Sequence, residues 1–192
     1  MPSIVVVPAA GRGERFGGAK LLAPIDGDVL IDRTLGALLD GGVDRAIVVI
    51  APSADLRASR RLDDPRVQVI VNPDPSRGMF SSIRAGLAVA DGDPMLVMPA
   101  DMPFVSASSV AAVQAACARD ACIVAPVHGG RRGHPVAFPA SLRSAILREP
   151  PESTLKAALV ATGARWVDVT VDDAGVLRDV DVPADMEASD RQ

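Results

Sequence analysis

The sequence predicts an α/β fold, a single three-layer α/β/α domain spanning residues 1–192 around a mainly parallel sheet. Three observations support this prediction. Short β-branched runs alternate with Ala- and Leu-rich stretches along the chain. The runs IVVV at 4–7 and AIVVI at 46–50 are apolar throughout, so both faces of these strands should be covered. A length of 192 residues suits one domain with a buried core, and no repeat or long linker divides it.

The β-branched runs give the strands and the Ala/Leu-rich stretches between them give the helices. Strands are predicted at residues 3–8, 45–51, 67–71, 95–99, 121–127, 135–138 and 164–171. Helices are predicted at residues 30–39, 54–60, 79–90, 106–119, 142–147 and 154–161. The alternation breaks after about residue 121, which predicts a mixed sheet there. Ligands of such sheets lie beyond the carboxyl ends of the strands, which selects the loops after Val7, Val71 and Met98.

Composition excludes several classes of partner. The net charge is −4 without a long basic run, and only 3% of residues are aromatic, which argues against nucleic-acid binding. The longest apolar runs are far shorter than a membrane span. The N-terminus lacks the basic region of a signal peptide. Cys117 and Cys122 lack metal-site spacing, and we expect buried thiols in a cytoplasmic protein.

The loop after the first strand is rich in glycine but matches neither common phosphate-binding pattern. Residues 8–20 read PAAGRGERFGGAK. Phe16 interrupts the GxGxxG dinucleotide fingerprint, and Asp32, which would have to bind the ribose, falls in a predicted helix. Ala19 separates Gly18 from Lys20, so the loop is not a P-loop either.

The same loop carries three cations, Arg12, Arg15 and Lys20, among small residues that let backbone N–H groups approach an anion. Lys20 is one of only two lysines among 20 basic residues, which hints at a need for a compact ammonium. Three cations within nine positions suit a triphosphate. The alternative is a surface loop with solvated arginines.

Five segments, in order, resemble the motifs of the MobA-like nucleotidyltransferases, and among these most resemble molybdenum cofactor (molybdopterin) cytidylyltransferases. They are PAAGRGERFGGAKLL at 8–22, NPDPSRGMFSS at 72–82, MPADMP at 98–103, GHPV at 133–136 and DVDVPAD at 179–185. The resemblance implies a Rossmann-like, nucleotide-diphospho-sugar transferase (GT-A-like) fold. It also implies transfer of CMP from CTP to molybdopterin, with magnesium as cofactor, pyrophosphate as product and a transient contact with a molybdenum enzyme.

The resemblance assigns roles to residues of this chain. The catalytic residues are Arg15, Lys20 and Asp101, and the acceptor-binding residues are His134 and Arg132. The metal ligands are Asp101 and Asp181, with Asp179 as the alternative to Asp181. The nucleotide-binding residues are Ala9, Ala10, Gly11, Arg12, Gly13, Lys20, Asn72, Gly78 and Ser81. Each role has a purely structural alternative. Asp101 suits a turn or helix cap, Asn72 suits a turn, and His134 suits ordering of its loop.

Departures from the family pattern leave the substrates open. Gly13 replaces a serine, Ala100 replaces a glycine, and REPPES at 148–153 stands where relatives carry GDxGxR on the acceptor side. The resemblance also implies a pyrimidine base, because AAG stands at 9–11 where guanylyltransferase relatives more often carry AGG. Remaining rivals are GTP as donor, a sugar or polyol phosphate as acceptor, and a non-catalytic accessory role in assembling a molybdenum enzyme. A dehydrogenase is disfavoured by the loop spacing.

Overall fold

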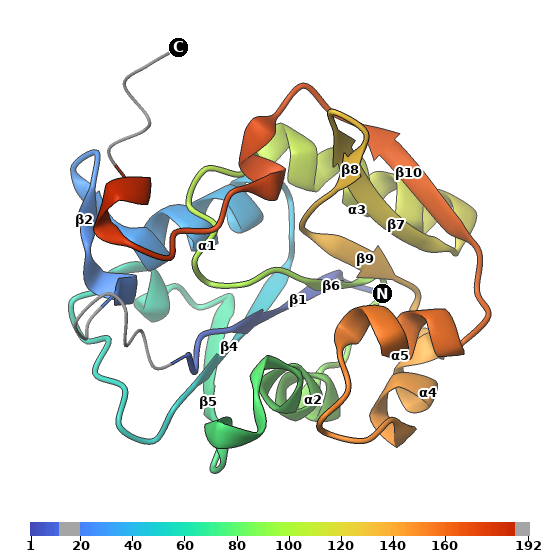
Figure 1. Cartoon of the computed structure of the whole chain (residues 1–192), viewed down its shortest axis with the longest axis horizontal. Coiled ribbons are helices and arrows are strands. Elements are labelled where there is room, and N and C mark those ends of the chain that lie inside the picture. Colours follow the sequence, from blue (N-terminus) through green and yellow to red (C-terminus); the bar gives the residue numbers. More distant parts are fainter. Residues whose placement is uncertain (12–19, 187–192) are drawn as a thin grey trace.

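The computed structural model describes residues 1–11 and 20–186. In this part of the chain an eight-stranded sheet runs in the order β10-β7-β9-β6-β1-β4-β5, with β8 added beside β7 (Figure 1). Its strands are β1 (Ile4–Pro8), β4 (Arg45–Ile50), β5 (Val67–Val71), β6 (Met95–Val97), β7 (Ile123–His128), β8 (Arg131–Arg132), β9 (Val136–Phe138) and β10 (Trp166–Thr170). Strand β9 is antiparallel to β6 and β7, and the other neighbours in that order are parallel. The expected mainly parallel, mixed sheet is confirmed.

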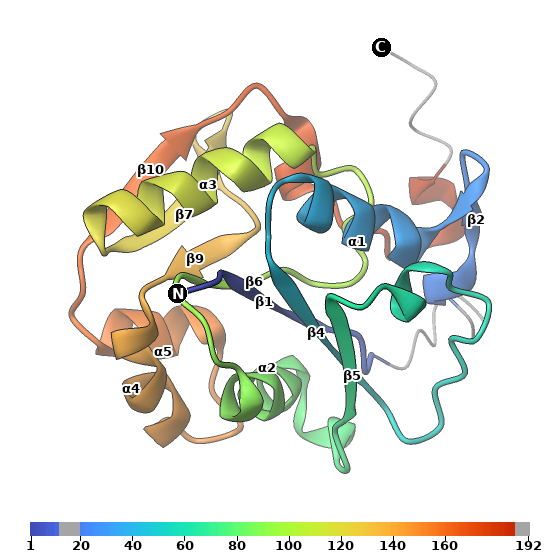
Figure 2. The ribbon, with the colours of Figure 1, turned by 180° about the vertical axis from the view of Figure 1, so that it is seen from behind.

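Helices cover both faces of this sheet, as Figures 1 and 2 show. They are α1 (Leu30–Asp40), α2 (Met79–Val89), α3 (Ala107–Asp120), α4 (Arg143–Arg148) and α5 (Leu155–Ala161). Helices α1 and α3 pack in one hydrophobic cluster, and α2, α4 and α5 pack in another. A short antiparallel pair outside the sheet, β2 (Pro24–Ile25) and β3 (Asp28–Val29), was not predicted.

Strand β1 is apolar throughout because both of its faces are buried. Val5 and Val7 belong to the cluster with α1 and α3, whereas Ile4 and Val6 belong to the cluster with α2. Successive side chains of a strand point to opposite faces, so an unbroken apolar run serves two cores. Helix α2 lies so close that a Cβ at Gly86 would stand 2.4 Å from a methyl group of Val6, which requires glycine there.

The predicted helix at 54–60 is wrong. This segment consists of turns and bends, followed by a short 3₁₀ helix at Arg61–Asp63. The buried carboxylate of Asp32 on α1 accepts hydrogen bonds from the Ser59 hydroxyl and from the backbone N–H groups of Arg60 and Arg61. These bonds replace the helical ones and hold the chain in turns. They also give Asp32 a structural task in place of ribose binding.

Hydrogen bonds join the loops at the carboxyl edge of the sheet. The backbone N–H of Ala9 donates to Val49 O at 2.8 Å, and that of Asn72 donates to Ile50 O at 2.9 Å. The N–H of Ala100 donates to Pro8 O at 3.2 Å. The ends of β1, β4, β5 and β6 are therefore brought to one place.

The structure bears on the state of the two cysteines and on membrane-spanning helices. Cys117 and Cys122 are buried free thiols, as expected. The Cys117 thiol donates to Cys122 O at 3.2 Å, and burial raises its pKa to about 12. Among the described residues no helix has the length and apolar character needed to cross a membrane.

Candidate functional site

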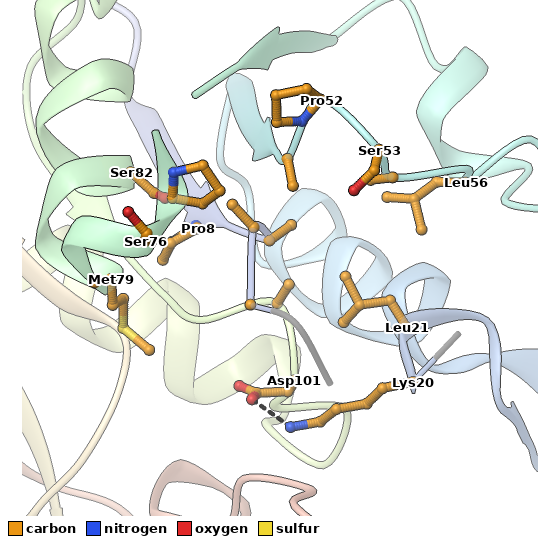
Figure 3. A pocket seen from close by; sticks show the side chains of 18 of the residues that line it. Pro8, Lys20, Leu21, Pro52, Ser53, Leu56, Ser76, Met79, Ser82 and Asp101 are labelled. Carbon is orange, nitrogen blue, oxygen red and sulfur yellow. Dashed lines mark hydrogen bonds and ion pairs between the residues drawn. The ribbon is translucent and has the colours of Figure 1, made fainter. Parts of the chain in front are cut away.

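A cavity of about 940 Å³ opens at the carboxyl edge of the sheet (Figure 3). Its lining residues are 8–11, 20–21, 51–56, 75–76, 78–79, 82 and 100–101. They come from the loops after β1, β4, β5 and β6, and the predicted loops after Val7, Val71 and Met98 all contribute. A cavity at this edge has the location typical of nucleotide sites in parallel sheets.

Lys20 and Asp101 meet at the cavity wall, although 81 positions separate them in the chain. The Lys20 ammonium lies 2.8 Å from Asp101 Oδ2 and 3.3 Å from Asp181 Oδ1. Figure 3 shows the first of these contacts as a dashed line. The side chains of Lys20 and Asp101 are only 13% and 22% exposed, whereas that of Asp181 is 56% exposed. A cation is thus already held beside two carboxylates.

Three hydrogen bonds fix the turn that carries Asp101. Its neighbour Ala100 donates to Pro8 O and accepts a bond of 2.9 Å from the buried Thr34 hydroxyl of α1. The carbonyl of Asp101 accepts from Val180 N–H at 2.9 Å. The carboxylate therefore projects from a turn held by β1, α1 and the C-terminal segment. The N-cap of the following helix, α3, is Ser106 rather than Asp101.

These two carboxylates fit a hard divalent cation. Magnesium bound to phosphates takes one or two protein carboxylates and retains several waters. Among the described residues no group of three or more His, Cys, Asp or Glu side chains could hold a metal by itself. Asp101 and Asp181 share an ammonium neighbour, so they face the same small volume, and their oxygen donors suit magnesium rather than zinc.

Asn72 holds the loop between β5 and α2 and is not among the residues lining the cavity. Its buried side-chain amide donates to the hydroxyls of Ser81 at 2.8 Å and Ser82 at 3.0 Å, and its Oδ1 accepts from Asp74 N–H at 3.1 Å. This is the turn-supporting geometry that the sequence left open as an alternative. Ser81 also bonds back to Gly78 O at 2.7 Å.

Gly78 lines the cavity at the start of α2 with φ +90°, a conformation that favours glycine. Ser82 on α2, which sequence reasoning did not assign to the site, also lies in the cavity wall. Ala9, Ala10 and Gly11, which the sequence assigns to nucleotide binding, all line the cavity. Arg12, Gly13 and Arg15 lie outside the described residues, so their predicted roles stay predictions.

His134 and Arg132 are placed differently from each other. The His134 Nδ1 is buried and has no hydrogen-bond partner among the described residues. Burial lowers the pKa of this imidazole, against a hydrogen bond to the Val97 backbone and the nearby carboxylates of Asp101 and Asp179. His134 thus lies in the electrostatic field of the candidate metal ligands.

Arg132 is instead engaged by strand β10 at one end of the sheet. Its Nε donates to Asp168 Oδ1 at 2.6 Å, and its guanidinium lies 4.8 Å from the Trp166 ring centroid. Arg132 does not line the cavity. Sequence proximity to His134 suggested a shared role, but the β8 strand directs the Arg132 side chain onto β10.

The loop at 51–56 is the part of the cavity that sequence reasoning did not single out. It follows β4, and β4 is the parallel neighbour of β1. The signal was available, because a loop after the strand beside the glycine-rich loop must open on the same edge. The wrong helix prediction at 54–60 concealed it.

Comparisons with known proteins identify the relatives of this chain. The nicotine blue oxidoreductase of Paenarthrobacter nicotinovorans is 33% identical over 150 residues, which cover 73% of this chain and 72% of that protein. The molybdenum cofactor cytidylyltransferase of Escherichia coli (strain K12) is 22% identical over 180 residues, covering 94% and 91%. The 2-C-methyl-D-erythritol 4-phosphate cytidylyltransferase of Rhodococcus opacus (strain B4) is 37% identical over 132 residues, covering 66% and 57%.

A solved structure agrees with this grouping. A nucleotidyl transferase from Methanothermobacter thermautotroptrophicus superimposes with a TM-score of 0.78 at 26% identity and covers 98% of this chain and 95% of that chain. The expected Rossmann-like nucleotidyltransferase fold is thereby confirmed. The family model of the MobA-like NTP transferase domain matches residues 5–171, and the chain belongs to this family.

Proposed function

We propose that this chain transfers CMP from CTP to molybdopterin and releases pyrophosphate, with magnesium as cofactor. The observation that carries the proposal is the contact of Lys20 with Asp101 and Asp181 at the wall of a 940 Å³ cavity. It joins a phosphate-binding cation to two candidate metal ligands beside a loop of small residues. The family relationship and the cytidylyltransferases among the relatives support it.

Nucleotidyl transfer requires the acceptor oxygen to attack the α-phosphorus in line, while pyrophosphate departs. The protein mainly positions the reactants and neutralises charge. In our proposal the triphosphate lies along the AAG segment at 9–11 and next to Lys20. The Lys20 ammonium stabilises the negative charge that grows on the α-phosphate and the leaving group, together with Arg15 and Arg12.

Asp101 and Asp181 would hold the magnesium ion, which supplies charge neutralisation between the phosphates when it is bound. In the structure the single positive charge of the Lys20 ammonium is shared by the two carboxylates. With the ion held by Asp101 and Asp181, the Lys20 ammonium would be available to bind phosphate. Lys20 thus has carboxylate partners in the structure and, in our proposal, phosphate partners when the nucleotide is bound.

The base and ribose would occupy the part of the cavity formed by the loops at 51–56 and 75–79. In Figure 3, Pro52 and Ser53 lie across the cavity from Lys20 and Asp101. Asn72 would act by holding Ser81 and Ser82 rather than by reading the base itself. On the acceptor side, a neutral His134 imidazole would form a hydrogen bond with the acceptor's phosphate.

We also place the reaction in the cytoplasm, because both cysteines are free thiols.

Two relatives define the competing functions. The Rhodococcus opacus relative is named for a different acceptor, 2-C-methyl-D-erythritol 4-phosphate. The segment REPPES at 148–153 bears on the choice of acceptor, because it contacts a loop of the cavity. The Glu152 carboxylate lies 2.7 Å from the Arg77 guanidinium, next to the cavity residues 75–76 and 78–79. An oxidoreductase function is suggested by the Paenarthrobacter relative, but residues 8–20 lack a dinucleotide fingerprint.

One assay separates these functions. The purified chain is given CTP, GTP, ATP or UTP with Mg²⁺ and either molybdopterin or 2-C-methyl-D-erythritol 4-phosphate, and pyrophosphate release is measured. We expect release only with CTP and molybdopterin. Turnover with the erythritol phosphate would replace the acceptor, and turnover with GTP would replace the donor. Bleaching of nicotine blue by NADH or NADPH, without any pyrophosphate release, would refute the transferase proposal.

A further inference from the structure

The C-terminal segment, residues 173–186, lies beyond the family match, which ends at 171, yet it reaches the candidate site. Several contacts fasten it to the body of the fold. Val176 O accepts from His134 N–H at 2.9 Å, and Val180 N–H donates to Asp101 O at 2.9 Å. Val176 and Val180 are fully buried. This segment is therefore a fixed part of the structure up to the residue before Asp181.

Beyond Val180 the chain becomes exposed, and the carboxylate of Asp185 accepts hydrogen bonds from its backbone. Asp185 Oδ2 accepts hydrogen bonds from the backbone N–H of Asp181 at 2.7 Å and of Val182 at 2.8 Å. Asp181 and Val182 are exposed residues. The Asp181 side chain nevertheless reaches the Lys20 ammonium at 3.3 Å. The two bonds from Asp185 fix the backbone from which that side chain projects.

We propose that Asp185 is a positioning residue that holds Asp181 in place to bind the divalent cation. The inference rests on the proposed function in taking Asp181 as a metal ligand. Groups that orient metal ligands generally change metal affinity 10- to 100-fold when they are removed. An exposed carboxylate on a less ordered backbone would lose affinity to conformational entropy, and the two hydrogen bonds to Asp185 reduce that cost.

A further contact holds the end of this segment in place. Arg178 also donates to the backbone carbonyl of Asp185 at 3.4 Å while its guanidinium stacks 4.0 Å from the Phe104 ring centroid. The end of the segment is thereby tied to the loop that follows Asp101.

The alternative role for Asp185 is to cap the short 3₁₀ helix Pro183–Asp185 without any consequence for the site. Metal affinity separates the two, because a cap alone would change only local stability. Binding of Mn²⁺, alone and without nucleotide, is measured by the loss of the free-ion EPR signal for the native chain, Asp185→Ala and Asp185→Asn. The amide oxygen of asparagine can accept the same two bonds. Asp64→Ala is the matched control, since Asp64 likewise accepts from a backbone N–H, that of Arg66, away from the cavity.

We expect Asp185→Ala to weaken Mn²⁺ binding about tenfold, with Asp185→Asn within about threefold of the native chain and Asp64→Ala unchanged. The Mg²⁺ concentration that half-activates CTP turnover should rise in the same order. Unchanged Mn²⁺ affinity in Asp185→Ala, equal loss in both Asp185 variants, or no Mn²⁺ binding by the native chain would each overturn the inference. A tenfold loss in a chain that does not use CTP would support it while refuting the proposed reaction.

Discussion

At the scale of the residue, the site depends on one cation and two carboxylates that different parts of the chain supply. Lys20 follows the glycine-rich loop, Asp101 follows β6, and Asp181 lies in the C-terminal segment. The Lys20–Asp101 pair is partly buried, so solvent screens it less than a surface pair. Its importance should nevertheless appear in catalysis more than in stability, since partly exposed pairs contribute about 1 kcal/mol or less.

Replacing the ammonium tests this directly. Lys20→Ala should lower kcat for CTP turnover by roughly 10²- to 10³-fold, because it removes a charge that acts on the transition state. The melting temperature should fall by only about 2–4 °C, the shift of about 1 kcal/mol in a chain of this size. Steady-state kinetics and a thermal melt measure both effects. A variant that melts earlier but retains kcat would mean that Lys20 serves the fold alone.

Replacing the carboxylate of Asp101 tests the proposed metal site. Asp101→Asn preserves shape and should abolish Mg²⁺-dependent turnover, with a loss of about 10²-fold or more, because a neutral amide is a poor magnesium ligand. Circular dichroism should match that of the native chain. Asp120→Asn is the control, since Asp120 pairs with Arg119 at the far end of α3. Full activity in Asp101→Asn would remove Asp101 from the metal site.

At the scale of the element, the C-terminal segment is attached to α3 by Asp173. Its Oδ2 accepts from Ser106 N–H, from the Ser106 hydroxyl and from the buried Ser109 hydroxyl, at 2.7–2.9 Å. Its Oδ1 accepts from Gly175 N–H at 2.9 Å. Gly175 itself must be glycine, because a Cβ there would stand 2.0 Å from Phe104 O.

Loss of this carboxylate should destabilise the chain in a pH-dependent way. Burial raises the pKa of Asp173, but its hydrogen bonds to Ser106, Ser109 and Gly175 outweigh burial and leave the pKa below its ordinary value. A lowered folded-state pKa stabilises above the unfolded-state pKa, near 4, and that stability is lost as the pH falls through the folded-state value. Asp173→Ala should therefore cost about 2 kcal/mol at pH 7, from unpaired polar groups.

Urea unfolding of the native chain and of Asp173→Ala, at pH 7 and at about pH 3, checks this prediction. The difference in unfolding free energy should shrink at the lower pH, because the stability that comes from a lowered folded-state pKa is lost as the pH falls below the unfolded-state pKa, near 4. A difference that does not change with pH would assign the stabilisation to packing. Activity at pH 7 reports whether the loosened segment also displaces Asp181.

Elements differ in how well a sequence can predict them, and two cases show why. Strand β1 was predictable because a run of Ile and Val that is buried on both faces has few other uses. The segment at 54–60 was not, because its conformation is imposed by Asp32 from a helix more than twenty positions earlier. In the site, Lys20 and Asp101 were found from motifs. The loop at 51–56 and the internal use of Asn72 depend on contacts that no local pattern records.

At the scale of the whole molecule, the sheet order determines where the site forms. Parallel neighbours β6, β1, β4 and β5 end on one edge, so four loops that are distant in sequence surround one cavity. The antiparallel β9 follows the turn that holds His134, which brings that histidine back towards the end of β6. Helices lie on both faces of the sheet (Figures 1 and 2), and the cavity opens at this edge. A ligand bound there contacts several elements at once and should stabilise the entire fold.

Thermal stability should therefore report the nucleotide. A ligand present at 100 times its dissociation constant adds about 2.7 kcal/mol, which corresponds to a rise of roughly 5–11 °C in a chain of this size. We expect this rise with CTP and Mg²⁺ together, a smaller one with CTP alone, and little with GTP, ATP or UTP. Asp101→Asn should lose the Mg²⁺-dependent part, because it removes a ligand of the ion and leaves the cavity intact. An equal rise with all four nucleotides would place recognition at the phosphates and refute base selection by the loops at 51–56 and 75–79. No rise with any nucleotide, with the acceptor present as well, would leave the accessory-protein hypothesis as the better account of this site.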